Sequence, residues 1–387
     1  MKTDFPHILC INPWIHDFAA FDFWAKPLGL LSIAAVLREQ GMGVSFIDCL
    51  DRFHPQAPGV PKILWDGRGP YHKTPIRQPS GLDDTARTFY RYGIKPEWFA
   101  ADLNAVKTPD LILVTSLMTY WASGVAETIE HVKQVFPDVP VILGGIYASL
   151  CFDHATATTR ADHVVKGPAE PCLKEIVRKF TGFVMDDRHW SGCLDDLPWP
   201  ALDLCRNITY APILTSRGCP FSCDYCASSF LEPGLRQRSP EGVFEEIAHW
   251  HHQHRITHMA FYDDALLVNA DRHAFPLLEK IIASKMDLSF HTPNALHVRE
   301  ISRQAAQLMF RAGFKTLRLG LETADFSPNR SHDHKVGNGE FLRAVSHLTA
   351  AGFAPDQIGA YLLCGLPGQH LDEVTASVAF VRQAGIT

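Results

Sequence analysis

Short apolar runs alternate with amphipathic segments along the first half of the chain. The runs have the composition of buried strands and lie at residues 7–12, 44–49, 110–116, 139–145 and 162–167. Segments with helical periodicity separate or follow them, such as residues 29–41 and 169–180. Near-continuous apolar strands between helices indicate a parallel sheet covered on both faces. Residues 1–182 are therefore expected to form an α/β domain, a doubly wound, Rossmann-like sheet with flavodoxin-like strand order and ligands beyond the strands' carboxyl ends.

A long excursion at residues 51–108 interrupts this alternation after the second strand. It is rich in proline, glycine, tyrosine and arginine, and it contains one predicted helix over residues 96–106. Connections of this length are usually functional or disordered, and the aromatic content favours order. Two interpretations stay open: a cap over a functional site, or a surface insertion with its own small core. A proline-rich linker is expected over residues 183–210.

A second alternating series follows over residues 211–387. Its expected strands are residues 210–216, 258–264, 288–294, 316–323 and 358–368, each with a helix after it. Ser239 and Pro240 have the types preferred at a helix N-cap and first turn. The series predicts a partial TIM-type (βα) barrel that lacks its sixth strand. A continuation of the gene product, or a partner chain, is expected to supply that strand.

The first strand of this series leads into TSRGCPFSCDYCA at residues 215–227. Cys219, Cys223 and Cys226 form a CxxxCxxC loop, and three thiolates this close suit a [4Fe–4S] cubane with one iron left open for a ligand. The alternative is a structural zinc site, which needs four ligands. Cys205 or a nearby histidine would then supply the fourth.

Polar residues recur where the predicted strands of the second series end. Asp263 and Asp264 end the second strand, Glu322 ends the fourth, and the GLPG turn at Gly365 ends the fifth. Active sites of β/α barrels lie at this edge, and buried polar groups are costly unless they are paired. For each carboxylate the alternative is a cap on the following helix.

With the aromatic Tyr225 just before its third cysteine, the loop resembles the signature of the radical S-adenosylmethionine (SAM) enzymes. The resemblance implies that Cys219, Cys223 and Cys226 ligate the cluster and that the open iron binds SAM, which is cleaved to a 5′-deoxyadenosyl radical. It also implies SAM contacts from the loop and the strand ends: Tyr225, Asp263, Asp264, Glu322 and Gly365.

The first domain resembles the cobalamin-binding domain of cobalamin-dependent radical SAM proteins. The resemblance rests on Thr115-Ser116, Gly144-Gly145 and the GPAE turn that begins at Gly167. It implies that these residues contact a corrinoid, whose tail would lie against the glycines. Tyr120, Trp121 and Tyr147 would shield the cavity from water, with core packing as the alternative for each.

Cobalt is expected to lack a histidine ligand. The string DRHWSG at residues 187–192 has the Asp-x-His-x-x-Gly form of cobalt-binding motifs, but it lies in the linker and not after the first strand. The loop after the first strand offers only His16, which is out of register. A further histidine cluster at residues 249–258 is interpreted as a solvated helix surface.

Composition narrows the classes of partner. The chain has 387 residues, 46% of them hydrophobic, and a formal net charge of −6, which argues against nucleic acid. No apolar run is long enough to span a membrane, and ten cysteines without a secretory signal indicate the cytoplasm.

These features predict a cobalamin-dependent radical SAM enzyme that moves a methyl group from methylcobalamin to an unactivated carbon of a small-molecule substrate. An electron donor such as flavodoxin or ferredoxin is the expected partner. The alternatives are a cyclase or rearrangement enzyme that uses cobalamin, and a non-catalytic module that binds a corrinoid or a cluster.

Overall fold

The structure is a computed structural model that describes residues 5–82, 85–188, 192–326 and 336–386, apart from the side chain of residue 338. The chain forms two compact units, Met1–Ile208 and Thr209–Thr387, and each is described by itself.

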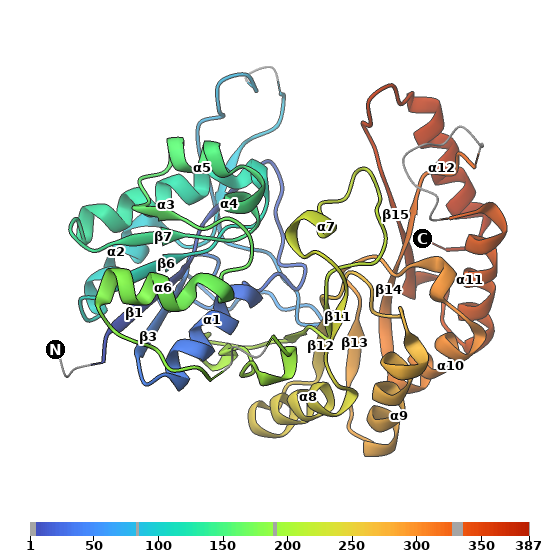
Figure 1. Cartoon of the computed structure of the whole chain (residues 1–387). Helices are drawn as coiled ribbons and strands as arrows, with labels where there is room; N and C mark the ends of the chain where they lie inside the picture. Colours follow the sequence, from blue (N-terminus) through green and yellow to red (C-terminus); the bar gives the residue numbers. More distant parts are fainter. Residues whose placement is uncertain (1–4, 83–84, 189–191, 327–335, 387) are drawn as a thin grey trace. The chain divides into compact units, whose positions relative to one another are not determined.

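A five-stranded parallel sheet forms the centre of the N-terminal unit (Figure 1). Its strands are β1 (His7–Asn12), β3 (Gly43–Asp48), β6 (Leu111–Val114), β7 (Val141–Leu143) and β8 (His163–Val164). They lie in the order β3-β1-β6-β7-β8, and every pair is parallel. Numbered along the chain this order is 2-1-3-4-5, which confirms the flavodoxin-like prediction.

Helices cover both faces of this sheet. Ile8 and Cys10 face α1 (Leu28–Glu39) and α6 (Glu170–Thr181), whereas the intervening residues of β1 face the other core, with α2 (Pro96–Ala105) and α3 (Ala122–Val135). Because alternate side chains point to opposite faces and both faces are buried, the strands read as continuous apolar runs.

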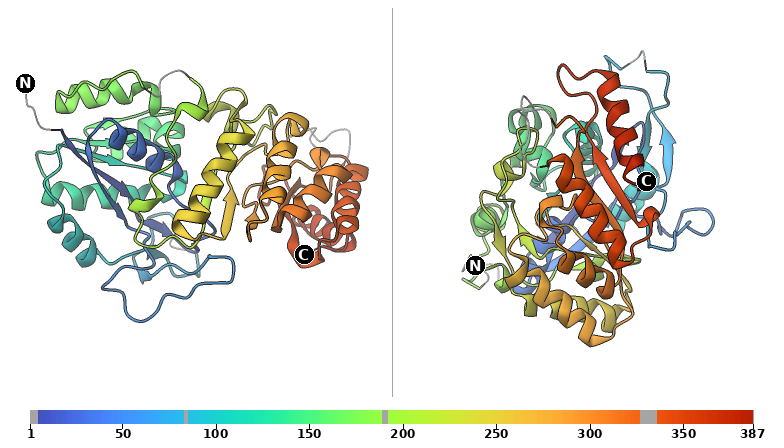
Figure 2. Two further views of the ribbon diagram at one scale, coloured as in Figure 1. Left: turned by 90° about the horizontal axis from the view of Figure 1, so that it is seen from below. Right: turned by 90° about the vertical axis from the view of Figure 1, so that its right-hand side faces the viewer.

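Two strands of the excursion form a small sheet with a strand that follows β1, and the sequence pattern did not predict this sheet. Strands β2 (Ile15–Asp17), β4 (Lys73–Pro75) and β5 (Tyr90–Tyr92) are antiparallel in the order β2-β5-β4, and each is too short to show a period of two. Ile15, Leu50, Tyr71 and Tyr92 form a small core beside it. Ile15 and Leu50 precede the excursion, so this core is shared with the rest of the unit. Figure 2 shows part of the excursion, in blue, as a long loop.

The proline-rich segment after α6 packs against the N-terminal unit. The Ala201 N–H donates to the Leu31 carbonyl at 3.0 Å, and Arg38 on α1 forms an ion pair with Asp203 at 2.8 Å. We call residues 192–208 the strap, since these contacts fasten it to α1.

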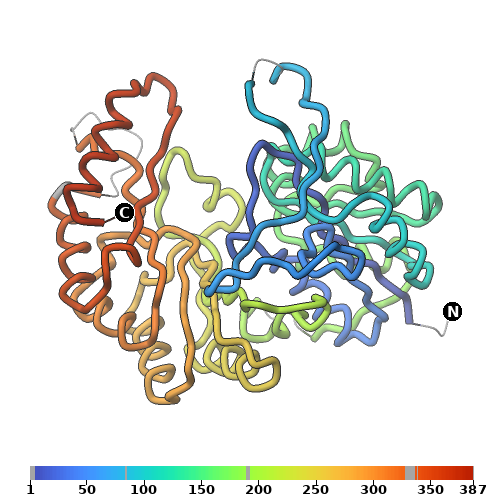
Figure 3. Tube along the Cα trace, turned by 180° about the vertical axis from the view of Figure 1, so that it is seen from behind, coloured from blue at the N-terminus to red at the C-terminus, as the bar shows by residue number. Residues whose placement is uncertain are grey.

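Five parallel strands also form the sheet of the C-terminal unit. They are β9 (Ala211–Ile213), β12 (His258–Phe261), β13 (Ser289–His291), β14 (Phe314–Glu322) and β15 (Ile358–Leu362). Each lies beside its predecessor in the series, so the trace in Figure 3 passes through this unit in sequence order from yellow to red. The arrangement confirms the partial (βα) barrel. Stacked rings of Phe261, Phe290 and Phe314, 5.4–5.6 Å apart, tie its central strands together.

Helices follow these strands as expected. They are α8 (Pro240–His254), α9 (Ala274–Ser284), α10 (Arg303–Ala312), α11 (Asn338–Ala351) and α12 (Leu371–Gln383). The Ser239 hydroxyl accepts the Gly242 N–H at 3.0 Å, which is the predicted N-cap of α8. Among the described residues, no helix has the length and apolar character needed to cross a membrane.

Candidate functional site

A short hairpin closes the base of the cysteine loop. Strands β10 (Ser216–Arg217) and β11 (Arg236–Gln237) pair antiparallel on either side of it. Gly218 has φ 80°, and a Cβ there would lie 1.9 Å from the Gly234 carbonyl oxygen, so the approach of the two chain segments requires glycine. Two-residue strands have no periodicity, which is why the sequence carried no signal for this hairpin.

Asp263 fixes the point where the loop leaves the barrel. Its carboxylate is 4% exposed and accepts hydrogen bonds from the Thr215 N–H at 3.1 Å, the Thr215 hydroxyl at 2.7 Å and the Ser216 hydroxyl at 2.6 Å. Burial raises the pKa of Asp263 against the opposing effect of these hydrogen bonds. His273, which the sequence analysis missed, lies 2.7 Å from the Thr215 hydroxyl. Through these contacts Asp263 anchors the start of the cysteine loop.

A hydrogen-bonded chain joins the third cysteine to two strand ends. The Cys226 thiol lies 3.2 Å from the Ser228 hydroxyl, which donates to Asp264 at 2.8 Å. The Asn294 amide lies 3.5 Å from the other Asp264 oxygen and donates to the Tyr262 carbonyl at 2.6 Å. Asp264 is exposed, so the structure brings this predicted carboxylate beside the cysteine loop with part of its surface open to solvent. Ser228 was not predicted.

The first cysteine contacts a histidine that the sequence analysis also missed. His297 Nε2 lies 3.6 Å from Cys219 Sγ, and the Phe221 ring packs on the imidazole with centroids 4.3 Å apart. His297 is 6% exposed and follows β13. His297 lies six residues after the end of β13 and is part of no sequence motif, so this contact could not be predicted from the sequence.

Glu322 has an unusual backbone at the end of β14. Its φ is 68°, and the Thr323 N–H donates to the Leu321 carbonyl at 2.8 Å, which closes a three-residue turn around it. Left-handed backbone at a residue other than glycine costs free energy, and such strained positions occur at active and ligand-binding sites as well as at helix ends. The Glu322 side chain is buried, at 7% exposed.

The glycine turn after β15 is held in place by the side chain of the residue that follows it, Gln369. Gly365 has φ 87°, and its N–H donates to the Gln369 side chain at 2.7 Å. The strand ends before this turn, which leaves Cys364 exposed. Cys364 follows an apolar run, but its thiol is not buried because the residue lies beyond the last ladder pair of β15, Glu322 with Leu362.

The three loop cysteines suit a cluster better than a single ion. All ten cysteines lie in the described residues, and no disulfide joins any two of them. Across the described residues, no group of three or more His, Cys, Asp or Glu side chains converges as one metal ion requires. In a cubane with three protein ligands each thiolate binds a different iron, so the three sulfur atoms do not need to meet at one point. Cys205, the suggested fourth zinc ligand, belongs to the other unit, where burial raises its pKa to about 12.

In the N-terminal unit, two of the predicted loops lock together at the carboxyl edge of the sheet. The Ser116 hydroxyl donates to the Gly144 carbonyl at 2.7 Å, and the Ile146 N–H donates to the Ser116 carbonyl at 2.8 Å. Gly145 has φ 98°, and a Cβ there would lie 2.2 Å from the Ser116 carbonyl oxygen. Thr115 continues β6, its N–H donating to the Ile11 carbonyl at 3.1 Å.

Ser149, on the short helix α4 (Ile146–Leu150), links the third predicted loop to these two. Its hydroxyl donates to the Gly145 carbonyl at 2.8 Å and accepts the Gly167 N–H at 2.9 Å. A Cβ at Gly144 or Gly167 would meet no atom within 4 Å, so both glycines border open space. The edge therefore fits the expected cradle, with backbone that a bulky ligand could approach closely.

The aromatic residues after these loops differ in position. Tyr147 is 1% exposed, belongs to the core and bonds His154 Nδ1 through its hydroxyl at 2.7 Å, which favours core packing. Tyr120 is 65% exposed and follows the exposed apolar residues Leu117 and Met118. Consecutive exposed apolar side chains beside an open glycine edge suit a large, partly apolar ligand.

Both ring nitrogens of His16 have partners inside the unit. Nδ1 lies 3.1 Å from the Ser123 hydroxyl, and Nε2 lies 2.9 Å from Glu127, which also pairs with Arg91. Burial opposes ionisation of Glu127, but the hydrogen bonds from His16 and Arg91 lower its pKa to about 2. His16 is therefore unsuited to bind cobalt. His189 of the linker string lies outside the described residues.

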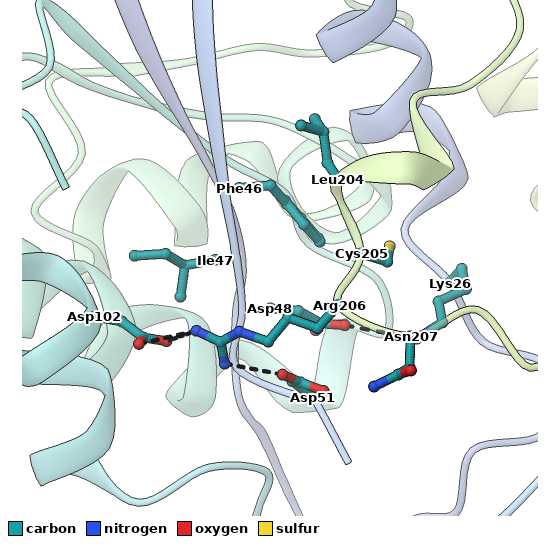
Figure 4. A pocket seen from close by; sticks show the side chains of 10 residues that line it. All are labelled: Lys26, Phe46, Ile47, Asp48, Asp51, Asp102, Leu204, Cys205, Arg206 and Asn207. Atoms are coloured by element: carbon teal, nitrogen blue, oxygen red, sulfur yellow. Dashed lines mark hydrogen bonds and ion pairs between the residues drawn. The ribbon is translucent and has the colours of Figure 1, made fainter. Parts of the chain in front are cut away.

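A small pocket in the N-terminal unit is lined partly by residues of the strap. Arg206 lies between Asp51 and Asp102, 3.0 Å from each, and Lys26 lies 3.7 Å from Asp48 (Figure 4). Cys205 lines the same pocket. The paired charges fasten the strap beside β3 and make this pocket a poor candidate for a cofactor site.

Two protein families match the chain. Residues 213–381 match the radical SAM superfamily, and residues 89–177 match the B12 binding domain.

Two curated relatives are methyltransferases by name. An uncharacterised methyltransferase of Pyrococcus horikoshii is 27% identical over 312 residues, which cover 72% of this chain and 65% of the relative. The cytidylyl-2-hydroxyethylphosphonate methyltransferase of Streptomyces wedmorensis is 22% identical and aligns with 98% of this chain and 78% of its own length. The match to the Pyrococcus protein thus spans less than two thirds of that protein.

The fold is similar to that of a solved structure. TsrM from Kitasatospora setae, a radical SAM methyltransferase, superposes with a TM-score of 0.69 at 16% identity, covering 99% of this chain and 72% of TsrM. That structure holds tryptophan and a SAM analogue, and a second TsrM structure holds cobalamin and a [4Fe–4S] cluster. At this identity the likeness establishes the fold.

Proposed function

Since the chain is a radical SAM protein that carries a B12 binding domain, we propose that it transfers a methyl group to an unactivated carbon of a small-molecule substrate. One observation carries the proposal: a three-cysteine loop at the strand ends of a partial barrel and an open glycine edge on a flavodoxin-like sheet occur in one chain. The methyltransferase relatives support this reaction over a rearrangement.

Cys219, Cys223 and Cys226 would hold a [4Fe–4S] cluster. When bound, the cluster and cobalamin supply the electron that cleaves SAM and the methyl group that is transferred. The protein's contribution is to fix the thiols through the β10–β11 hairpin, Asp263 and the Ser228–Asp264 contact.

SAM would be bound by the groups at the strand ends next to this loop. Asp264 and Glu322 are the proposed carboxylates, with Tyr225 and the Gly365 turn as further contacts. Asp264 is exposed beside the loop, and the strained backbone at Glu322 is typical of a ligand-binding position. Asp263 would act indirectly, because its oxygens hold Thr215 and Ser216.

The corrinoid would lie on the carboxyl edge of the first sheet. Gly144 and Gly167 offer open backbone, Thr115, Ser116 and Gly145 set the shape of the edge, and Tyr120 offers an exposed ring. Cobalt would have no histidine ligand, since both nitrogens of His16 are engaged. We propose residues 1–182 as the cobalamin domain and residues 211–387 as the radical SAM domain.

The proposed cofactors and the composition of the chain also suggest its cellular location, its electron donor and its class of substrate. Cysteines without disulfides and an oxygen-sensitive cluster favour the reducing cytoplasm, with flavodoxin or ferredoxin as electron donor. The substrate would be a small molecule, and the acidic net charge of −6 argues against a nucleic acid.

Anaerobic reconstitution with iron, sulfide, cobalamin and SAM bearing a deuterated methyl group tests the proposal. Candidate small molecules are supplied, and products are analysed by mass spectrometry, with the Cys226→Ala protein as control. We expect an intact labelled methyl group in the product, formed together with 5′-deoxyadenosine and S-adenosylhomocysteine. A product without label, formed with 5′-deoxyadenosine alone, would assign a cyclisation or rearrangement instead.

A further inference from the structure

His297 contacts two residues of the cysteine loop and belongs to neither the loop nor the predicted SAM contacts. Its Nε2 lies 3.6 Å from Cys219 Sγ, within the range of a hydrogen bond to sulfur, and its ring packs on Phe221. The side chain is 6% exposed, so water has little access to this contact.

The backbone around His297 is fixed by the neighbouring strand. Leu296 forms a bridge to Leu319 of β14. Its N–H donates to the Arg318 carbonyl at 2.7 Å, and its carbonyl accepts the Gly320 N–H at 3.1 Å. The imidazole is thus attached to the barrel sheet and not to the loop, so it can hold its position when the loop takes up a cluster.

We propose that His297 is a positioning residue that donates an Nε2–H hydrogen bond to the sulfur of Cys219 and thereby raises the reduction potential of the bound cluster. This inference rests on the proposed function, because it requires the cluster. Adding one electron from an external donor places more negative charge on the iron–sulfur unit and its thiolates. A hydrogen bond to a ligating sulfur stabilises that charge, and such bonds are among the features that set cluster potentials.

Burial strengthens this effect. Phe221 covers one side of the imidazole, so the N–H acts in surroundings less polar than water, where a hydrogen bond is electrostatically stronger. Removing the donor should therefore make the reduced cluster harder to form while leaving the three thiolate ligands in place.

The test is a redox titration of the reconstituted full chain without SAM, followed by electron paramagnetic resonance of the reduced cluster. His297→Phe removes the N–H and keeps a ring against Phe221, and His297→Leu serves as a second variant if the first unfolds. We expect full iron content and a reduction potential more negative than that of the wild type. His297→Gln, which restores an N–H donor, should recover part of the shift. His347→Leu, in the same unit but hydrogen-bonded to the Ile301 carbonyl, is the control and should leave the potential unchanged.

Two outcomes would overturn the proposal. An unchanged potential in His297→Phe and His297→Leu would mean that the imidazole donates nothing to the cluster. Loss of iron as complete as in Cys219→Ala would make His297 a ligand, as in the zinc interpretation. The readouts also separate this inference from the proposed function. A shifted potential in a protein that transfers no methyl group would count against methyl transfer and support the role of His297.

Discussion

The two candidate cofactor sites of this chain, the carboxyl edge of the N-terminal sheet and the cysteine loop, are lined by different kinds of groups. At the edge of the N-terminal sheet, the Ser116 and Ser149 hydroxyls bond backbone groups of Gly144, Gly145 and Gly167. Around the cysteine loop of the C-terminal unit, side chains converge instead: His297 lies at Cys219, and the Ser228–Asp264 pair lies at Cys226.

The difference matches what each ligand would need. A corrinoid is a large ligand whose reactivity resides in the cofactor itself. Its site therefore needs a complementary shape and backbone that the ligand can approach closely. A cluster bound by three thiolates depends on charge and hydrogen bonding around sulfur, so its site requires oriented polar side chains. Substitutions should therefore act through sterics at the first edge and through ligation and electrostatics at the second.

The largest effect is expected at the thiols. Replacing Cys219, Cys223 or Cys226 by Ala should abolish cluster formation, measured as iron content and visible absorption after anaerobic reconstitution, because each thiolate binds a different iron. The exposed Cys364 is the matched control, and Cys364→Ala should retain the cluster. If Cys205→Ala loses metal as fully as Cys219→Ala and the metal is zinc, the cluster assignment is wrong.

At the carboxyl edge of the N-terminal sheet, substitutions of two adjacent glycines should affect stability and cobalamin binding separately. Gly145→Ala should destabilise the N-terminal unit by about 1–3 kcal/mol or more, because it combines positive φ with a Cβ 2.2 Å from the Ser116 carbonyl oxygen. Gly144→Ala points into open space, so it should leave the thermal midpoint nearly unchanged and weaken cobalamin binding. Thermal unfolding and spectroscopic titration with cobalamin measure the two effects. Unaltered cobalamin affinity in Gly144→Ala would move the corrinoid away from this edge.

At the barrel, the neighbouring residues Asp263 and Asp264 should likewise differ, the first affecting stability and the second affecting SAM binding. Asp263→Asn should lower stability by about 1–3 kcal/mol, since it disturbs buried hydrogen bonds from Thr215 and Ser216. Asp264→Asn, at an exposed position, should change stability by less than about 0.5 kcal/mol while it lowers SAM affinity. Chemical unfolding and equilibrium binding of SAM give the two values. The reverse pattern would exchange the roles of the two carboxylates.

The smallest effect concerns acid stability of the N-terminal unit. The pKa of Glu127 is about 2 in the folded protein and 4.5 ordinarily, so its ionised form stabilises the fold. This contribution is complete above about pH 4.5 and is lost as the pH falls towards 2. The difference in unfolding free energy between wild type and Glu127→Gln should shrink over that interval. Glu130→Gln, exposed on the same helix, is the control. A difference independent of pH would show that the pairs with His16 and Arg91 do not depend on the charge of Glu127.

The elements with strong periodicity could be predicted from local sequence alone. The strands of the two five-stranded sheets, the N-cap at Ser239 and the CxxxCxxC loop were all found in this way. Flavodoxin-like order and the partial barrel followed, because continuous apolar strands between helices have few ways to bury both faces. The three thiols were recognisable because their spacing lies within one loop.

What surrounds those thiols was decided by the tertiary structure. His297 is separated from Cys219 by 78 positions, and Asp264 from Ser228 by 36, so no local pattern could pair them. The sequence placed Asp263 and Asp264 equally at a strand end, whereas the fold buried one under Thr215 and exposed the other. Periodicity reports which face of an element is apolar, but contacts between polar side chains of different strands depend on register and loop closure. Those are properties of the whole packed chain.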